Sequence, residues 1–395
     1  MTEIVVSGIG IISSLGRTLE ENRAALKNGE SGISLSNPKR SKSTQYPFGE
    51  IRETTEELNL AIDSSEIDFL TRVEVLSKIA FQEAIKDANL TTKELQSRRT
   101  AFISASSVGG MDQIEAFYKD VTENKTASRY INSYSASVHL HKIVKHYKMK
   151  GPTSVINTAC SSSANAIMLG AKLLKQNKVD IAIVGGVDCL SDFTIRGFNS
   201  LGILTKNSCK PFDENREGLN LGEAGVYLVL RKESKELSQK KYGVIAGWAN
   251  TNDSYHSSAL NEDGTGIISC ISQALASAKI SAVDIGFINA HGTGTGNNDL
   301  AELTAVSKIF PKAVLLSSTK SYTGHTLAAS GALECVFSLL GLEHQEFYPS
   351  LSIQNPLSIK GVQATTKYRK IKANYALSNS FGFNGNCTSL VISKT

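Results

Sequence analysis

One cysteine of the sequence lies between a short apolar run and a stretch of small residues. Cys160 stands in NTACSSSA, where a predicted strand ends and a predicted helix begins. The N-terminus of a helix carries partial positive charge and unpaired N–H groups, so it is expected to lower the pKa of a thiol placed there. The same strand–turn–helix placement presents the nucleophile in many hydrolases. We therefore expect Cys160 to be a nucleophile rather than an inert buried cysteine.

Two histidines also follow predicted strands, in the C-terminal part of the chain. His291 lies in NAHGTGTGNND and His325 in STKSYTGHTLAASGALE. The first segment contains a G-x-G pattern without a Walker lysine, so it is a weak candidate for a phosphate-binding loop. In the second segment, Glu334 stands among apolar residues of a predicted helix, where a carboxylate is costly unless it is paired. Lys320 is the expected partner.

A cysteine and two histidines at strand ends indicate acyl transfer to a thiol. A cysteine hydrolase would need one histidine as a base, oriented by an Asn or Asp. Two histidines and a lysine suit another task, which is to donate hydrogen bonds to an oxygen that becomes an enolate when a second substrate loses CO₂.

The elements that position these residues follow from hydrophobic periodicity. Short apolar runs alternate with longer amphipathic ones, which is typical of β-α units around a buried, largely parallel sheet. Strands are predicted at 4–12, 101–105, 154–157, 181–187, 226–230, 285–290, 314–318, 376–378 and 390–393. Helices are predicted at 70–88, 160–175, 266–278, 300–309 and 327–344. A charged stretch, 232–241, reads as a linker between segments 1–235 and 236–395, each with its own strand series. The polar insertion 107–150 is expected to form a lid or a dimer contact.

Composition excludes several classes of protein. The chain has 395 residues, of which 41% are hydrophobic, a net charge of +5 and a single Trp. This net charge is too small to indicate a protein that binds nucleic acid, and one Trp offers little surface for stacking on bases. We expect no membrane span, because no apolar run reaches 18 residues. The N-terminus lacks the basic region of a signal peptide, so a cytoplasmic location is expected.

No metal site is expected from the cysteines and histidines. The six cysteines form no CxxC pair, and the cluster of His139, His141 and His146 lacks acidic or Cys partners. We therefore place these histidines at a surface or interface.

The sequence resembles the β-ketoacyl-acyl-carrier-protein synthases, the decarboxylating condensing enzymes of fatty-acid and polyketide assembly. Five motifs occur in the family's order, and they read TACSSS, KPFDENREG, NAHGTGTGNND, KSYTGHTLAASGALE and NSFGFNG. The resemblance implies an α/β, thiolase-like fold in which two duplicated βαβαβαββ halves form five α-β-α-β-α layers. It also implies a homodimer or a heterodimer with a related subunit. The enzyme itself would bind no cofactor, since its substrates are carried on the phosphopantetheine of an acyl carrier protein.

The resemblance assigns the chemistry to matching positions. Cys160 would be the acylated nucleophile, His291 and His325 would activate the malonyl thioester, and Lys320 and Glu334 would support the site.

The same motifs imply residues that hold the substrate. The backbone N–H groups of Cys160 and Phe383 would form the oxyanion hole, and Phe383 would act as a gate between the acyl pocket and the entrance. Thr293 and Thr295 would bind the phosphopantetheine arm. Val108 would line the acyl pocket and set chain-length tolerance.

Some positions depart from the family's pattern. In the loop 381–387, where Phe381 and Asn384 are expected to contact substrate, Asn384 replaces a glycine beside the gate. A side chain at a hinge restricts the backbone, so a narrower range of acyl chains is expected. The segment 64–68, which often carries a basic docking patch, is acidic here. The fallback docking candidates are Lys206, Lys210, Arg129 and the region 142–150.

Three other functions compete with this interpretation. A thiolase would use coenzyme A and a second cysteine, for which Cys387 is the candidate. A cysteine hydrolase is a more distant alternative. A non-catalytic partner subunit of a polyketide system would lack the nucleophile, whereas Cys160 is retained. The departures make a specialised polyketide or polyene synthase at least as good an interpretation as a housekeeping fatty-acid enzyme.

Overall fold

The computed structural model describes residues 3–35, 45–60, 62, 71–124, 128, 130–233, 240–311 and 313–395. The boundary predicted between 235 and 236, most of the linker 232–241, the acidic segment 64–68 and Arg129 lie outside these residues.

The N-terminal half follows the order βαβαβαββ. Its elements are β1 (Ile4–Ser13), α3 (Arg72–Asp87), β4 (Thr100–Ala105), α6 (Val138–Tyr147), β5 (Thr153–Ile156), α7 (Ser162–Lys175), β6 (Ile181–Asp188) and β7 (Ala224–Lys232). The strands lie in the order β5-β4-β6-β7-β1, with β4 parallel to β5 and β6 and with β7 antiparallel to β6 and β1.

The C-terminal half repeats this order. Its elements are β8 (Gly243–Asn252), α9 (Thr265–Ala278), β9 (Ile285–Asn289), α10 (Gly296–Ile309), β10 (Leu315–Ser317), α12 (Ser330–His344), β15 (Tyr375–Phe381) and β16 (Asn386–Ser393). The strand order β10-β9-β15-β16-β8 has the same parallel and antiparallel pairs as the first half. The duplication expected from the sequence is therefore present in the topology.

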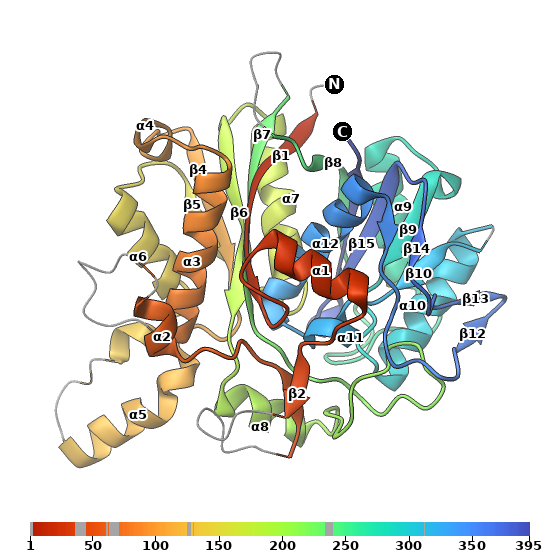
Figure 1. Cartoon of the computed structure of the whole chain (residues 1–395), viewed down its shortest axis with the longest axis horizontal. Helices are drawn as coiled ribbons and strands as arrows, with labels where there is room; N and C mark the ends of the chain where they lie inside the picture. Colours follow the sequence, from red (N-terminus) through yellow and green to blue (C-terminus); the bar gives the residue numbers. More distant parts are fainter. Residues whose placement is uncertain are drawn as a thin grey trace.

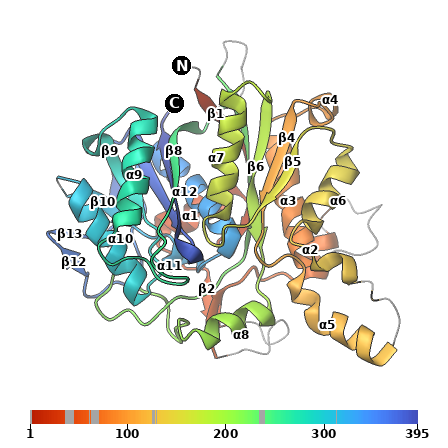
Figure 2. The same ribbon diagram turned by 180° about the vertical axis from the view of Figure 1, so that it is seen from behind.

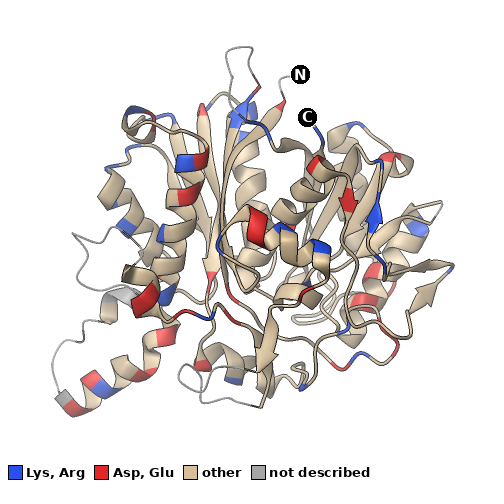
Figure 3. Ribbon diagram, viewed as in Figure 1, with Lys and Arg blue, Asp and Glu red and all other residues tan. Residues whose placement is uncertain are grey.

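The two five-stranded sheets meet at their central edges. Val5 and Val6 of β1 pair antiparallel with Val244 and Gly243 of β8, which joins the strands into one ten-stranded sheet. Figures 1 and 2 show α7 and α12 between the two halves, α3 and α6 on one flank, and α9 and α10 on the other. The fold is thus the predicted thiolase-like stack of α-β-α-β-α layers. Charged residues lie mainly on the outer helices and loops (Figure 3).

Shorter elements complete the described chain. The helices are α1 (Leu19–Asn28), α2 (Thr55–Leu60), α4 (Thr92–Leu95), α5 (Ile114–Lys119), α8 (Asp192–Ser200) and α11 (Lys320–Thr323). The strands are β2 (Ile33–Leu35), β3 (Pro47–Gly49), β11 (Glu346–Phe347), β12 (Ser358–Ile359), β13 (Val362–Gln363) and β14 (Arg369–Lys370). Two 3-10 turns adjoin the site described below, η5 (Leu327–Ala329) and η6 (Phe383–Gly385). Among the described residues, none of the helices has both the length and the apolar character needed to span a bilayer.

The predicted strands and helices are present, and the differences have physical causes. β8 was missed because its sequence, GVIAGWANTN, mixes glycines and polar residues with the apolar ones. Gly247 is needed there, since a Cβ at this position would lie 2.6 Å from Ala278 of α9.

The insertion 107–150 contains α5 and α6. The prediction of a surface position is wrong for His139, which is buried in α6 and bonds Ser104 Oγ through Nε2 at 2.7 Å.

Candidate active site

The turn that carries Cys160 connects β5 to α7. Ala159 has a φ of +51°, a left-handed conformation that is uncommon for a residue with a Cβ and indicates local strain. The Ser162 Oγ accepts a hydrogen bond from Thr158 N at 2.8 Å and so closes the turn. Cys160 itself is 6% exposed. The turn therefore presents a buried thiol after the end of a strand, as the sequence predicted, although β5 itself is exposed or half-buried.

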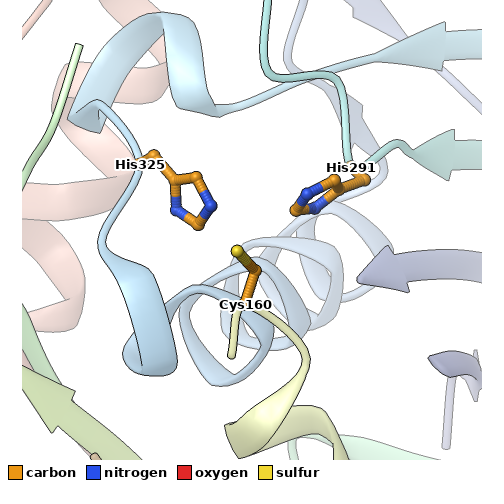
Figure 4. A group of neighbouring side chains, drawn as sticks. All are labelled: Cys160, His291 and His325. Atoms are coloured by element: carbon orange, nitrogen blue, oxygen red, sulfur yellow. The ribbon is translucent and has the colours of Figure 1, made fainter. Parts of the chain in front are cut away.

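Both predicted histidines reach the same point from the other half. His291 follows β9, and His325 lies between α11 and η5, after β10. The two rings face each other edge to face with centroids 5.6 Å apart. A sulfur or nitrogen atom from each of Cys160, His291 and His325 lies within 4.8 Å of the other two. Figure 4 shows the three side chains pointing toward one another.

Lys320 connects His291 to Glu334 of the central helix α12. Its ammonium group forms the predicted ion pair with Glu334 of α12, and both side chains are buried. The same Nζ donates to the backbone oxygen of His291 at 2.7 Å and lies 3.2 Å from His291 Nδ1. An ammonium group can only donate, so Nδ1 of His291 must accept, and the ring proton is on Nε2.

His325 has the same tautomer for a different reason. Its Nδ1 accepts a hydrogen bond from the backbone N–H of Leu327 at 3.1 Å and lies 3.0 Å from Ser330 Oγ. The proton is therefore on Nε2, which is buried and has no hydrogen-bond partner among the described residues. Burial, followed by the Lys320 charge, holds the pKa of both His291 and His325 well below 6.5. Both rings are neutral hydrogen-bond donors at neutral pH.

The expectation of a lowered thiol pKa is wrong. Burial raises the pKa of Cys160 to about 11, because desolvation outweighs the Lys320 charge and the backbone N–H groups of Phe383 and Cys160. The helix starts only at Ser162, so the thiol is not within its first turn. The backbone N–H groups of Phe383 and Cys160 both act on the sulfur, and their role as an oxyanion hole stays a prediction.

Cys160, His291 and His325 are residue types that bind zinc, but the groups around the two histidines do not suit a metal site. A metal-bound histidine donates its other ring N–H to an acceptor. Here the other nitrogen of His325 faces the Leu327 N–H, and that of His291 faces the Lys320 ammonium group. Both Nδ1 atoms already accept a hydrogen bond. If Nε2 bound a metal, the ring proton would move to Nδ1, where it would face the Leu327 N–H in His325 and the Lys320 ammonium group in His291. The arrangement suits hydrogen-bond donation to a substrate oxygen instead.

Two cavities meet at the thiol. The first has a volume of about 250 Å³, and its lining includes Cys160, His291, His325, Thr293, Thr295, Phe381, Asn297 and Leu260. The second has a volume of about 370 Å³ and a mostly apolar lining that includes Val108, Met111, Phe193, Phe198 and Leu327. Phe383 and Cys160 line both cavities.

The structure brings most of the predicted substrate residues to these cavities. Thr293 and Thr295 lie in the first, with their hydroxyl oxygens 2.8 Å apart. Phe381 packs edge to face on His291. Val108 lines the second cavity. Asn384 is exposed and lines neither cavity, so the structure does not place it against the substrate.

Sequence reasoning missed three residues of the site. Phe198 of α8 stacks on Phe383 with centroids 6.0 Å apart, and no sequence pattern marked it. Glu302 accepts from the backbone N–H groups of His291 and Gly292 at 3.0 and 2.9 Å. Asp188 follows a predicted strand, and that position was a signal that could have identified it.

Comparisons with known proteins agree along the whole chain. Residues 1–236 match the family model "Beta-ketoacyl synthase, N-terminal domain", and residues 242–354 match "Beta-ketoacyl synthase, C-terminal domain". The 3-oxoacyl-[acyl-carrier-protein] synthase 2 of Vibrio harveyi is 30% identical, over 99% of this chain and 98% of that protein. The Staphylococcus aureus (strain COL) protein of the same name is 29% identical, over 99% of this chain and 98% of that protein.

Solved structures show the same fold. The ishigamide ketosynthase/chain length factor superposes with a TM-score of 0.93 at 25% identity, covering 100% of this chain and 99% of that chain. The ketosynthase ApeO in complex with its chain length factor ApeC, from Xenorhabdus doucetiae, has a TM-score of 0.85 at 28% identity, covering 100% and 98%.

The raised pKa of Cys160 predicts how the thiol reacts with iodoacetamide. Because only the thiolate reacts, the alkylation rate of Cys160 should rise by about tenfold per pH unit from pH 7 to 9 without levelling off. Peptide mapping by mass spectrometry would follow Cys160 separately from the five other buried cysteines. A rate that is constant above pH 8 would show a resting thiolate and contradict this account.

Proposed function

The chain belongs to the β-ketoacyl synthase family, and we propose that it extends acyl chains by decarboxylative condensation with a malonyl unit, both carried by an acyl carrier protein. It is an acyltransferase of the condensing type. One observation carries the assignment of roles to residues: a buried thiol shares a cavity with two neutral histidines that carry their protons on Nε2, and the Nε2 of His325 has no hydrogen-bond partner among the described residues.

The first half-reaction uses Cys160. Its sulfur attacks the thioester carbonyl of the acyl carrier, and the N–H groups of Cys160 and Phe383 stabilise the oxyanion that forms. The bond to the carrier sulfur then breaks, and the proton of the Cys160 thiol ends on the carrier thiol. No proton is gained or lost overall, so this step needs no permanently ionised cysteine.

The second half-reaction uses the histidines. The malonyl group loses CO₂, and the electron pair of the broken bond forms an enolate whose oxygen accepts hydrogen bonds from Nε2 of His291 and His325. The enolate carbon attacks the acyl thioester on Cys160, the bond to the Cys160 sulfur breaks, and the thiolate that leaves takes up one proton from solvent. Lys320 and Glu334 touch no reacting atom in this scheme; they hold His291 in the donating tautomer.

The alternative functions fit the geometry less well. A cysteine hydrolase requires a histidine with an unprotonated nitrogen toward the thiol, whereas both Nε2 atoms carry protons here. A thiolase requires a second cysteine at the cavity. Cys387 is buried in β16 and lines neither cavity.

The partners follow from the substrates. A carrier protein must reach the first cavity, and Lys206, which is exposed, follows Ile203 of the lining by three residues. Lys206 and Lys210 therefore remain our docking candidates, whereas Lys142 already pairs with Glu74 at 2.9 Å. One structurally similar protein, the type II polyketide ketosynthase AntDE, was solved with its acyl-carrier protein AntF. We extend this partnership to the present chain.

Assembly, cofactors and location are part of the proposal. Two similar structures are ketosynthases paired with chain length factors, which supports a dimer with a second copy or a related subunit. We propose that the enzyme binds no cofactor of its own, because the scheme above needs none. The six free cysteines support the cytoplasm as its compartment.

A specialised polyketide or polyene pathway is our preferred assignment, supported by the gate loop. Asn384 has a φ of +61°, the left-handed region in which glycine is the family's usual residue. Its backbone N–H donates to Ser257 O at 2.7 Å, and its carbonyl accepts from Asn252 Nδ2 at 3.0 Å. Asn tolerates this conformation but has less backbone freedom than Gly, so the loop is stiffer.

Replacing either histidine should separate the two half-reactions. Removing one oxyanion donor costs about 100- to 1000-fold in rate, so His291→Ala and His325→Ala should each suppress release of CO₂ from malonyl-carrier protein by that factor. Self-acylation of Cys160, read by intact mass, should change far less. Cys160→Ala should abolish the mass gain.

The matched control is His344→Ala, at the far end of α12, which should leave both half-reactions unchanged. If the two histidine variants lose acylation as severely as decarboxylation, a histidine acts as the base for the thiol and the proposed roles are wrong.

Asn384→Gly should widen the range of saturated acyl chains that load onto Cys160. The backbone hydrogen bonds of residue 384 survive this change, and only the freedom of the loop increases. Asn89→Gly is the matched control, since Asn89 is also exposed and left-handed but lies far from the site, at the end of α3. Loading would be measured by intact mass across a series of chain lengths. A wild-type enzyme that already accepts all saturated lengths equally would contradict the specialised assignment.

A further inference from the structure

The carboxyl group of Asp188 lies at the end of β6 and is fully buried. Among the described residues it has no Lys, Arg or His within ion-pair distance, and its partners are hydroxyl and backbone N–H groups. Burial raises the pKa of this carboxyl, and the hydrogen bonds that it accepts from Ser107, Ser106, Val108 and Ala328 oppose the rise. Donors converge on both of its oxygens, as expected for an ionised carboxylate.

One oxygen of Asp188 holds the wall of the acyl cavity. Oδ1 accepts from Ser106 Oγ at 2.7 Å and from the backbone N–H groups of Ser107 and Val108, each at 3.0 Å. Val108 lines the second cavity, and Ser107 lines it as well. The position of this wall is therefore set by the end of β6.

The other oxygen holds the turn that follows His325. Oδ2 accepts from the backbone N–H of Ala328 at 2.8 Å and from Ser107 Oγ at 2.5 Å. The preceding residue, Leu327, donates the N–H that fixes the tautomer of His325, and its side chain lines the second cavity. Leu327 has a φ of +54°, a strained conformation that persists only when its surroundings hold it.

A glycine on the same strand shows how closely the turn is seated. A Cβ at Gly186 would lie 3.1 Å from the carbonyl oxygen of Ala328 and 3.0 Å from Ala105. A side chain there would push η5 away from β6 and stretch the hydrogen bond between Asp188 and Ala328.

We propose that Asp188 is a positioning residue that fixes the acyl-cavity wall at Val108 and the His325 turn to one strand end, so that a single carboxylate sets the geometry of both half-reactions. This inference rests on the proposed condensing function. Asp188 touches no reacting atom; it acts through the N–H of Leu327 on the His325 ring, and through Val108 on the space left for the acyl chain.

Asp188→Asn tests the proposal with almost no change of shape. The amide nitrogen of the variant must replace either Oδ2 or Oδ1. At the first position it would face the Ala328 N–H, and the turn after His325 would lose its acceptor. At the second it would face the Val108 N–H, and the cavity wall would lose its acceptor. A displacement of about 1 Å can cost about 100-fold in rate. We expect decarboxylation of malonyl-carrier protein to fall at least about tenfold relative to Cys160 acylation by a short chain, and the preference among acyl lengths to change.

The control is Asp87→Asn. Asp87 accepts from the backbone N–H of Ile9 at 2.9 Å and from the Tyr242 hydroxyl at 2.7 Å, on the side of the sheet covered by α3 and away from the thiol. It should lower the melting temperature without changing the ratio of the two half-reactions or the length preference. A wild-type ratio and length preference in a folded Asp188→Asn variant would overturn the proposal.

If Asp188→Asn does not fold, Ser107→Ala decides, because it removes one hydroxyl donor from the same carboxylate. A shift of the ratio in the same direction supports the proposal, and an unchanged ratio overturns it. The proposed function fails separately: in that case the wild-type protein itself would take no acyl mass from a carrier and release no CO₂ from malonyl-carrier protein.

Discussion

The buried ion pair between Lys320 and Glu334 is the interaction on which the site depends. A lysine without a partner at this depth would lose its charge or unfold its surroundings, and Glu334 supplies the compensation from the central helix α12. With the charge retained, Lys320 obliges His291 to accept at Nδ1 and contributes to keeping both histidines neutral. The same charge partly offsets the burial that raises the pKa of Cys160. The charge of Lys320 thus lowers the pKa of Cys160, of His291 and of His325.

The duplicated architecture explains why these groups meet. Each half places polar residues after its parallel strands, and the central helices α7 and α12 hold the two halves together. Cys160 comes from the first half, whereas His291 and His325 come from the second. The thiol and the two histidines are therefore attached to different halves of the ten-stranded sheet, and their spacing is as rigid as the packing between the halves. Phe383 and Phe198 stack on each other and line both of the cavities that meet at the thiol.

The sequence was sufficient to predict the features that depend on local patterns of residues, and insufficient to predict those that depend on tertiary packing. Apolar runs identified nearly all strands of the large sheet, and the motifs identified Cys160 and both histidines. The thiol pKa was predicted in the wrong direction, because a helix N-terminus can be read from residues whereas burial cannot. The sequence predicted that Asn384 contacts the substrate, but the residue is exposed. It shapes the loop through its left-handed backbone and not through its side chain. Phe198 and Asp188 both act through residues distant in sequence; no pattern marked Phe198, and the strand-end position of Asp188 did not reveal its partners.

The central claim is that His291 and His325 are neutral donors through Nε2. Long-range ¹⁵N–¹H correlation spectra of the ¹⁵N-histidine-labelled enzyme would test it directly, with His291→Ala and His325→Ala spectra assigning two of the seven histidines. The account predicts that both rings show the Nε2–H tautomer at pH 7 and that neither gains a proton between pH 8 and pH 6. An imidazolium signal, or a proton on Nδ1 of either ring, would contradict it.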